Sequence, residues 1–225
     1  MNPQSTLEQL KLLKLQGMAT GYQAILDLPS HQHPGAHELL SELTQKEVMS
    51  RAQIKTEIYL RLSKLRYSAT LDEIQYADQR NLSKQQITSF ADCTYIKRAE
   101  NILITGATGC GKSFLACALG HQACLLGYKP LYLNMNRFIE MIMLTKLDGT
   151  FIKLLNRIEK VHLLILDDFG LQPLKAETRL ALLQILEDRY QRKSTIIASQ
   201  LPVNKWYEYF ARCHPGRCHF RPPYC

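Results

Sequence analysis

The sequence predicts an α/β fold with a parallel sheet, preceded by a helical N-terminal region. Short apolar runs recur after residue 101, in NILIT, PLYLN, VHLLILDD and STIIASQ, and a helical pattern follows each. Runs of this kind are typical of parallel strands that are buried on both faces. A glycine-rich loop joins the first run to a helix. In residues 5–90, which precede this loop, apolar residues recur with a helical period.

The helical region contains two apolar stripes separated by a loop. Leu7, Leu10 and Leu13 share one helical spacing, and IKTEIYLRLSKL carries a second stripe at period 3.6. The loop LPSHQHPGAH holds three histidines but no cysteine or carboxylate of its own, and such histidines are usually solvated rather than metal-bound. We expect a helical region over residues 1–80, an α/β domain over 81–210 and a separate tail over 211–225.

Composition favours a globular protein of a reducing compartment. The 225 residues are 46% apolar and 21% charged, which is ordinary for such a chain. No apolar run has the length of a membrane helix, and the N-terminus lacks the pattern of a signal peptide. Four of the seven cysteines are scattered through the body of the chain, which does not suggest a disulfide framework. We expect a cytoplasmic protein without a membrane partner.

The net charge of +8 favours a polyanionic partner. The basic excess is concentrated in residues 46–66 and 186–225. The charges of the first segment spread around the expected helix, so a solvated helix explains them equally well.

The strongest motif is a phosphate-binding loop. GATGCGKS matches G-x-x-x-x-G-K-[ST], and it stands between a strand and a helix, as that motif requires. Its glycines let backbone N–H groups turn towards a phosphate, and the helix N-terminus adds partial positive charge. Lys112 is expected on the β- and γ-phosphates and Ser113 on Mg²⁺. The predicted nucleotide-binding residues are Gly106, Ala107, Thr108, Gly109, Cys110, Gly111, Lys112 and Ser113.

Two further pairs of polar residues follow predicted strands. Asp167 and Asp168 come directly after four apolar residues, where Asp167 can hold the Mg²⁺ shell and Asp168 can polarise the attacking water. Ser199 and Gln200 end the last predicted strand, where a side chain can sense the γ-phosphate. Together with Lys112, these four residues form the predicted catalytic set.

The stretch from the phosphate loop through LLILDDFGLQPL to LEDRYQRKSTIIASQLPVNKWYE resembles the IstB family of transposition helper ATPases. That family belongs to the AAA+ class and is related to the DnaC helicase loaders. The segments LKLLKLQGM and RLSKLRYSATLDEI also resemble its N-terminal region, so the likeness covers about residues 5–210.

The resemblance implies a P-loop AAA+ sheet with strand order 5-1-4-3-2, and cofactors ATP and Mg²⁺. It implies a homo-oligomer on double-stranded DNA that assists a partner transposase. By the same resemblance, the motif residues named above bind nucleotide and metal, and Ser199 and Gln200 act as the sensor. The implied DNA contacts are Arg51, Lys55, Arg61, Lys64 and Arg66.

Two alternatives stay open beside a transposition helper. One is a helicase loader that serves the replicative helicase, against which the segment ASQLPVNKWYE counts. The other is a degenerate remnant of the family without catalytic activity, which the tail supports.

The tail ARCHPGRCHFRPPYC departs from the family pattern. Permitted codons for it, read one base later, give PGATLADAIFDRLT, which resembles the family's own helical segment. We therefore interpret the tail as an out-of-frame segment. We expect strand 5 and the DRL arginine to be missing, the NILIT strand to be an exposed edge, and hydrolysis to be impaired. A zinc set of Cys213, His214, Cys218 and His219 has an unusual spacing, and a basic DNA-binding tail is the remaining alternative.

Overall fold

The computed structural model of the chain describes residues 2–76 and 82–211. The predictions for residues 212–225, which include the zinc set and the out-of-frame segment, lie outside the described residues. The chain divides into two compact units between Ile58 and Tyr59, and each unit is described by itself.

The first unit consists of helices that pack closely at a glycine. Its elements are α1 (Pro3–Leu12), α2 (Gln16–Leu26), η1 (Ser30–Gln32) and the first part of α3 (Ala36–Ser63). A Cβ atom on Gly17 would lie 2.4 Å from the carbonyl oxygen of Lys46, so only glycine lets α2 approach α3 this closely. Beside this contact, Met18 N–H donates to Oε2 of buried Glu47 over 3.1 Å.

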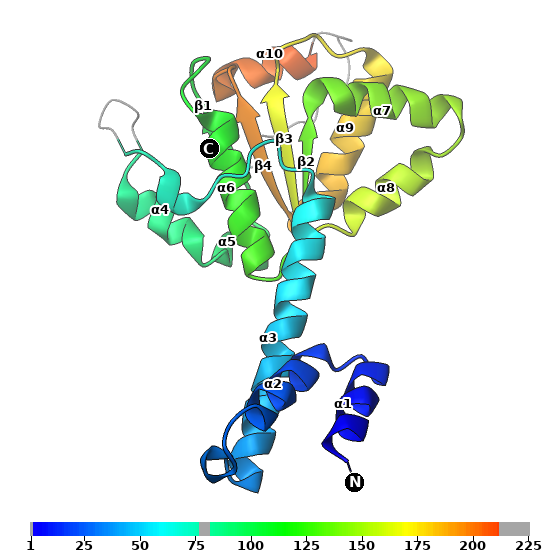
Figure 1. Cartoon of the computed structure of the whole chain (residues 1–225). Coiled ribbons are helices and arrows are strands. Elements are labelled where there is room, and N and C mark those ends of the chain that lie inside the picture. The colour runs from blue at the N-terminus through cyan, green and yellow to red at the C-terminus, as the bar shows by residue number, and fades with distance from the viewer. Residues whose placement is uncertain (1, 77–81, 212–225) are drawn as a thin grey trace. The chain divides into compact units, whose positions relative to one another are not determined.

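The second unit is a parallel sheet with helices on both faces (Figure 1). Its strands are β1 (Ile102–Thr105), β2 (Pro130–Asn134), β3 (Leu163–Phe169) and β4 (Ser194–Ser199). Its helices are η2 (Leu71–Glu73), α4 (Lys84–Ala91), α5 (Thr94–Lys97), α6 (Lys112–Leu125), α7 (Met135–Leu147), α8 (Phe151–Glu159), α9 (Ala176–Arg189), η4 (Val203–Lys205) and α10 (Trp206–Ala211).

The strand order confirms the predicted fold class. Within the described residues the order is β1-β4-β3-β2 and every pairing is parallel, which is the 1-4-3-2 part of the expected arrangement. β1 pairs with β4 alone in this part of the chain, and its Leu103 is 43% exposed. The carboxyl ends of all four strands meet at one edge of the sheet, as in any parallel sheet.

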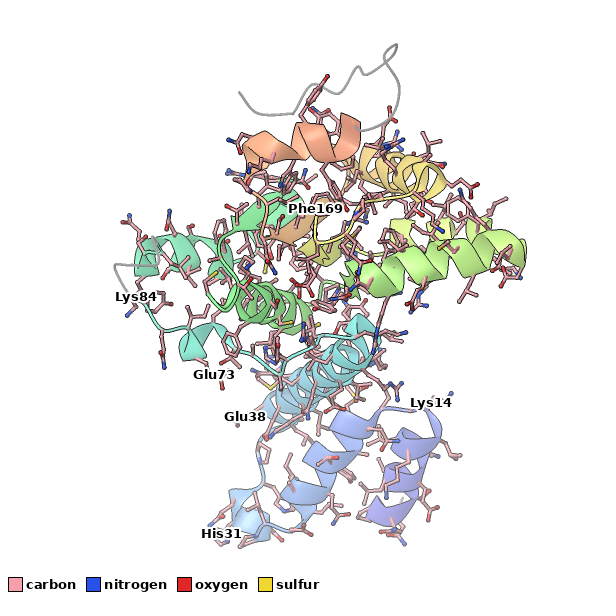
Figure 2. The ribbon with its side chains drawn as sticks, turned by 90° about the horizontal axis from the view of Figure 1, so that it is seen from above. Lys14, His31, Glu38, Glu73, Lys84 and Phe169 are labelled. Carbon is pink, nitrogen blue, oxygen red and sulfur yellow. The ribbon has the colours of Figure 1, made fainter. Side chains whose placement is uncertain are left out.

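Alternate strand residues enter two separate cores. Leu164 and Leu166 pack with α7, α8, α9 and α10, whereas Leu163 and Ile165 pack with α4, α5 and α6. At the carboxyl end of β3, the ring of Phe169 lies against the aromatic side chains of α10, with its centroid 4.8 Å from that of Trp206 (Figure 2). This contact fixes the segment after β4 against the sheet.

The division into units falls earlier in the chain than the expected boundary after residue 80. Ala69 and Ile74 are buried in the same core as α6, and a Cβ atom on Gly120 would lie 2.8 Å from Leu65. Residues after α3 therefore pack with the sheet. In the described part of the chain, no helix combines the length and apolarity that crossing a membrane requires.

Candidate nucleotide-binding site

The phosphate loop begins at the end of β1 and is attached to the neighbouring strand. Gly106 N–H donates to the Ser199 carbonyl oxygen of β4 over 3.3 Å. Gly109 and Gly111 have φ angles of 81° and 89°, which L side chains rarely adopt, so these glycines allow the loop to reverse. The N–H groups of the first turn of α6 have no acceptor within the helix and can receive an anion.

Lys112 and Gln200 both contact this loop through their side chains. Lys112 Nζ donates to the Ala107 carbonyl oxygen over 2.7 Å, which places the ammonium group across the loop. Thr108 Oγ1 donates to Gln200 Oε1 over 2.8 Å, although the two residues are far apart in sequence. The structure therefore brings the predicted sensor Gln200 to the phosphate loop.

Ser199, the other predicted sensor residue, is fully buried. Its hydroxyl donates to the Phe169 carbonyl oxygen over 2.8 Å and accepts from Leu201 N–H over 3.0 Å. These bonds join the carboxyl ends of β3 and β4 and set the position from which Gln200 reaches Thr108.

Asp167 is 1% exposed and is held by two hydrogen bonds at the end of β3. Its Oδ2 accepts from the Tyr132 hydroxyl over 2.6 Å, and its Oδ1 accepts from Asp168 N–H over 2.9 Å. Burial, together with the adjacent carboxylate, raises the pKa of Tyr132, so this hydroxyl remains a donor. Each carboxylate oxygen keeps a further lone pair for a metal ion or its water.

Asp168 occupies an uncommon backbone conformation beside Asp167. Its φ angle is 58°, and it lies between Leu166 and Phe169, where the pairing of β3 with β4 is irregular. Its Oδ2 accepts from Asn134 Nδ2 over 2.6 Å and lies 3.8 Å from a guanidinium nitrogen of Arg66. A strained backbone at a site of adjacent acids is typical of functional positions, where the surrounding structure must hold the conformation.

The five residues predicted to contact DNA lie in different surroundings. Arg51 donates to Glu47 over 2.7 Å, and this bond is the main cause that lowers the pKa of Glu47. Arg66 lies at Asp168 and over the ring of Tyr67, 5.2 Å from its centroid. Lys64 and Arg66 line a cavity along β2, whereas Lys55 and Arg61 lie on exposed faces of α3.

Cys110 gives the loop a chemical probe. It is exposed, whereas Cys93 and Cys124 are buried, and burial raises their pKa values to about 11 and about 12. We expect iodoacetamide to alkylate Cys110 before those two. At an ATP concentration about ten times Kd, the rate at Cys110 should fall about tenfold, because only the nucleotide-free protein reacts. Peptide mapping by mass spectrometry measures this rate, and an unchanged rate would place ATP elsewhere.

The sheet order, the loop on β1 and the acids on β3 define a P-loop protein of the AAA+ fold class. AMPPCP-bound DnaA from Aquifex aeolicus is similar, with a TM-score of 0.55 and 25% identity over 63% of this chain and 44% of that one. The DnaC helicase loader has a TM-score of 0.52 and 17% identity, over 63% of this chain and 82% of that one. The DnaC likeness shows the fold alone.

Comparison at the level of sequence is more specific. The family model of the IstB-like ATP binding protein matches residues 8–214, and the chain belongs to this family. A relative from Sinorhizobium fredii, named as an insertion sequence ATP-binding protein, is 38% identical over 203 residues, which cover 90% of this chain and 83% of the relative. A similarly named protein of the insertion sequence IS1162 from Pseudomonas fluorescens is 39% identical over 90% of this chain and 88% of its own length.

Tyr132, Asn134 and the link from Thr108 to Gln200 were not predicted. Tyr132 and Asn134 are the polar residues of the otherwise apolar run PLYLN, and the carboxyl end of a parallel strand lies at the edge of the sheet where ligands bind. A polar side chain within a buried strand needs a partner, which is the signal that could have identified these two residues.

Proposed function

We propose that this protein binds ATP with Mg²⁺ and uses the nucleotide to assist a transposase at double-stranded DNA in the cytoplasm. The observation that carries the proposal is the phosphate loop with Lys112 across it and Gln200 hydrogen-bonded to it. Membership of a family described as ATP binding, with relatives named after insertion sequences, supports the same function.

The residues at the site suit Mg²⁺, which prefers oxygen donors and keeps several waters. Ser113 stands in the first turn of α6, and Asp167 ends β3 with lone pairs still available. We assign these two residues to the metal, directly or through water. Bound Mg²⁺ would neutralise negative charge on the β- and γ-phosphates.

The remaining site residues divide the work of hydrolysis. Asp168 is the group that orients the attacking water, and Asn134 and Arg66 set the direction of its carboxylate. Gln200 senses the γ-phosphate, and Ser199 holds the strand end that carries it. We assign the nucleotide-dependent domain to residues 81–210, together with residues 59–76, which pack on its sheet and carry Arg66. We expect it to act as a homo-oligomer on DNA.

A helicase loader is the second candidate, since the DnaC loader shares the fold. The insertion-sequence relatives cover most of the chain at 38% and 39% identity, whereas the loader is 17% identical. The transposition helper is therefore the better supported of the two.

An ATP-dependent DNA-binding assay tests the proposal. We expect the 225-residue chain to bind a fluorescent duplex more tightly with Mg²⁺ and AMPPCP than without nucleotide, by about tenfold or more, because nucleotide couples subunits on DNA. In a parallel pull-down, an insertion-sequence transposase should co-elute, and the replicative helicase should not. Co-elution of the helicase alone would replace the proposal by the loader function.

A further inference from the structure

A cavity of about 790 Å³ lies along β2 and has a basic lining. Its walls include Lys64, Arg66, Arg137 and Arg157, and the acidic residue of the lining is Asp168. Asp168 already accepts a hydrogen bond from Asn134 and pairs with Arg66 at 3.8 Å. The other three cations face this cavity without a carboxylate in its lining to neutralise them.

A second cavity of about 380 Å³ continues this lining over α8. Arg157 belongs to both cavities, and Lys129, Lys153, Lys160 and Asn156 complete the second lining. This cavity has basic and amide side chains only. Because Arg157 is shared, the two linings form one surface, which we call the β2–α8 surface.

The geometry of α8 places its cations in a row. Lys153, Arg157 and Lys160 are spaced by four and three residues and are all exposed, so they share one face of the helix. At a rise of 1.5 Å per residue, Arg157 lies about 6 Å from Lys153 along the helix axis, and Lys160 lies about 10 Å from it. Among the described residues, no carboxylate lies within ion-pair distance of Arg157 or Lys160.

The opposite face of α8 is already used in the core. Leu154 and Ile158 are buried at 6% and 1% exposure and pack beneath the helix against the sheet. A membrane-binding amphipathic helix needs that apolar face to enter the lipid boundary. The face of α8 that is left for a ligand is therefore the one that carries the cations, which suits an anion.

The extent of the row decides which anion fits. A single phosphate group is bound by donors that converge on one point, whereas these cations extend over two adjoining cavities. Nucleic acid carries phosphates at regular intervals, and proteins that bind its backbone contact several of them with arginine and lysine. Asp168 is the one carboxylate in the two linings, and Arg66 and Asn134 already contact it, so the linings repel such a backbone little.

We propose that the β2–α8 surface binds the phosphate backbone of double-stranded DNA. This inference rests on the proposed function for the identity of the polymer, and it goes further in locating the contact on the sheet unit. Of the residues expected from sequence to contact DNA, Lys64 and Arg66 belong to the surface. Its other cations are contributed by α7, α8 and the start of β2.

The test uses the full chain and a triple variant, Lys153→Gln, Arg157→Gln and Lys160→Gln. These side chains are exposed, so the substitutions leave the core intact. With duplex DNA, we expect the slope of log affinity against log salt to decrease by about 2–3, since each lost phosphate contact removes about 0.9. Affinity at low salt should fall about tenfold or more, equally for unrelated DNA sequences.

A control variant carries the same charge change elsewhere. Lys84→Gln, Lys175→Gln and Lys205→Gln change exposed residues outside the linings of both cavities, and Lys84 lies on α4, away from α7 and α8 (Figure 2). This control should keep the wild-type slope and affinity. ATP affinity should stay the same in both variants, because neither changes the phosphate loop.

The possible outcomes separate this inference from the proposed function. If wild type and both triple variants bind DNA alike, the assignment of DNA binding to the β2–α8 surface is wrong, and the proposed transposition function is unaffected. If the α8 variant loses ATP affinity instead, the surface serves a nucleotide and the inference is overturned. If wild-type protein binds no duplex at any salt, both the inference and the DNA part of the proposed function fail. A third variant, in which Arg51 and Lys55 are changed to Gln, tests α3 as the competing contact.

Discussion

Replacing Lys112 by alanine is expected to lower the affinity for ATP about 10- to 100-fold, because hydrogen bonds to charged groups contribute about 1.5–3 kcal/mol. In the structure, the ammonium group of Lys112 lies across the phosphate loop, 2.7 Å from the Ala107 carbonyl oxygen. No other cationic side chain belongs to the GATGCGKS loop, so the variant has no substitute for it there. Titration with a fluorescent ATP analogue measures the change.

The matched control for this experiment is Lys84→Ala. Lys84 is an exposed lysine in the first turn of α4, so its removal tests the loss of one positive charge near a helix N-terminus. It should bind ATP as the wild type does, and circular dichroism should show that both variants are folded. Unchanged ATP affinity in folded Lys112→Ala protein would mean that the loop does not bind the nucleotide.

Sequence patterns predicted the strands and the phosphate loop because both are local. The runs NILIT, PLYLN and STIIASQ each form a strand that differs from its run by at most one residue, and VHLLILDD contains most of β3. Parallel strands buried on both faces leave such runs in any sequence. The loop motif is equally local, since its glycines and lysine follow one another between a strand and a helix.

The remaining parts of the site depend on contacts between distant segments. Thr108 meets Gln200, and Asn134 meets Asp168, only because β1, β4, β3 and β2 pair in that order. The β2–α8 surface is built in the same way, from cations that are widely separated in sequence and do not form a charge run. A charge count located the basic excess in residues 46–66 and 186–225, and only the first of these segments contributes to the β2–α8 surface, through Lys64 and Arg66.

Arg189 is a further residue that sequence patterns did not single out. It ends α9, where a basic residue is commonly solvated, but it is 3% exposed. Its guanidinium group donates to the carbonyl oxygens of Ile158, Val161 and Ser194 over 2.9, 3.2 and 2.6 Å. Burial lowers its pKa to about 10, which leaves the side chain charged at neutral pH. These bonds join α8, β3 and β4 at the end of the sheet opposite the phosphate loop.

Arg189→Met is expected to lower the free energy of unfolding by about 3–5 kcal/mol, since each buried carbonyl left without a donor costs about 1–3 kcal/mol. Urea denaturation followed by circular dichroism measures this change. Arg192→Met, at an exposed position three residues later, should stay within about 0.5 kcal/mol of wild type. Because Arg189 lies away from the phosphate loop, the fraction of variant that remains folded should bind ATP with wild-type affinity. A variant as stable as the wild type would mean that water donates to these carbonyl groups in place of the guanidinium, and that the arginine is not needed to join the three elements.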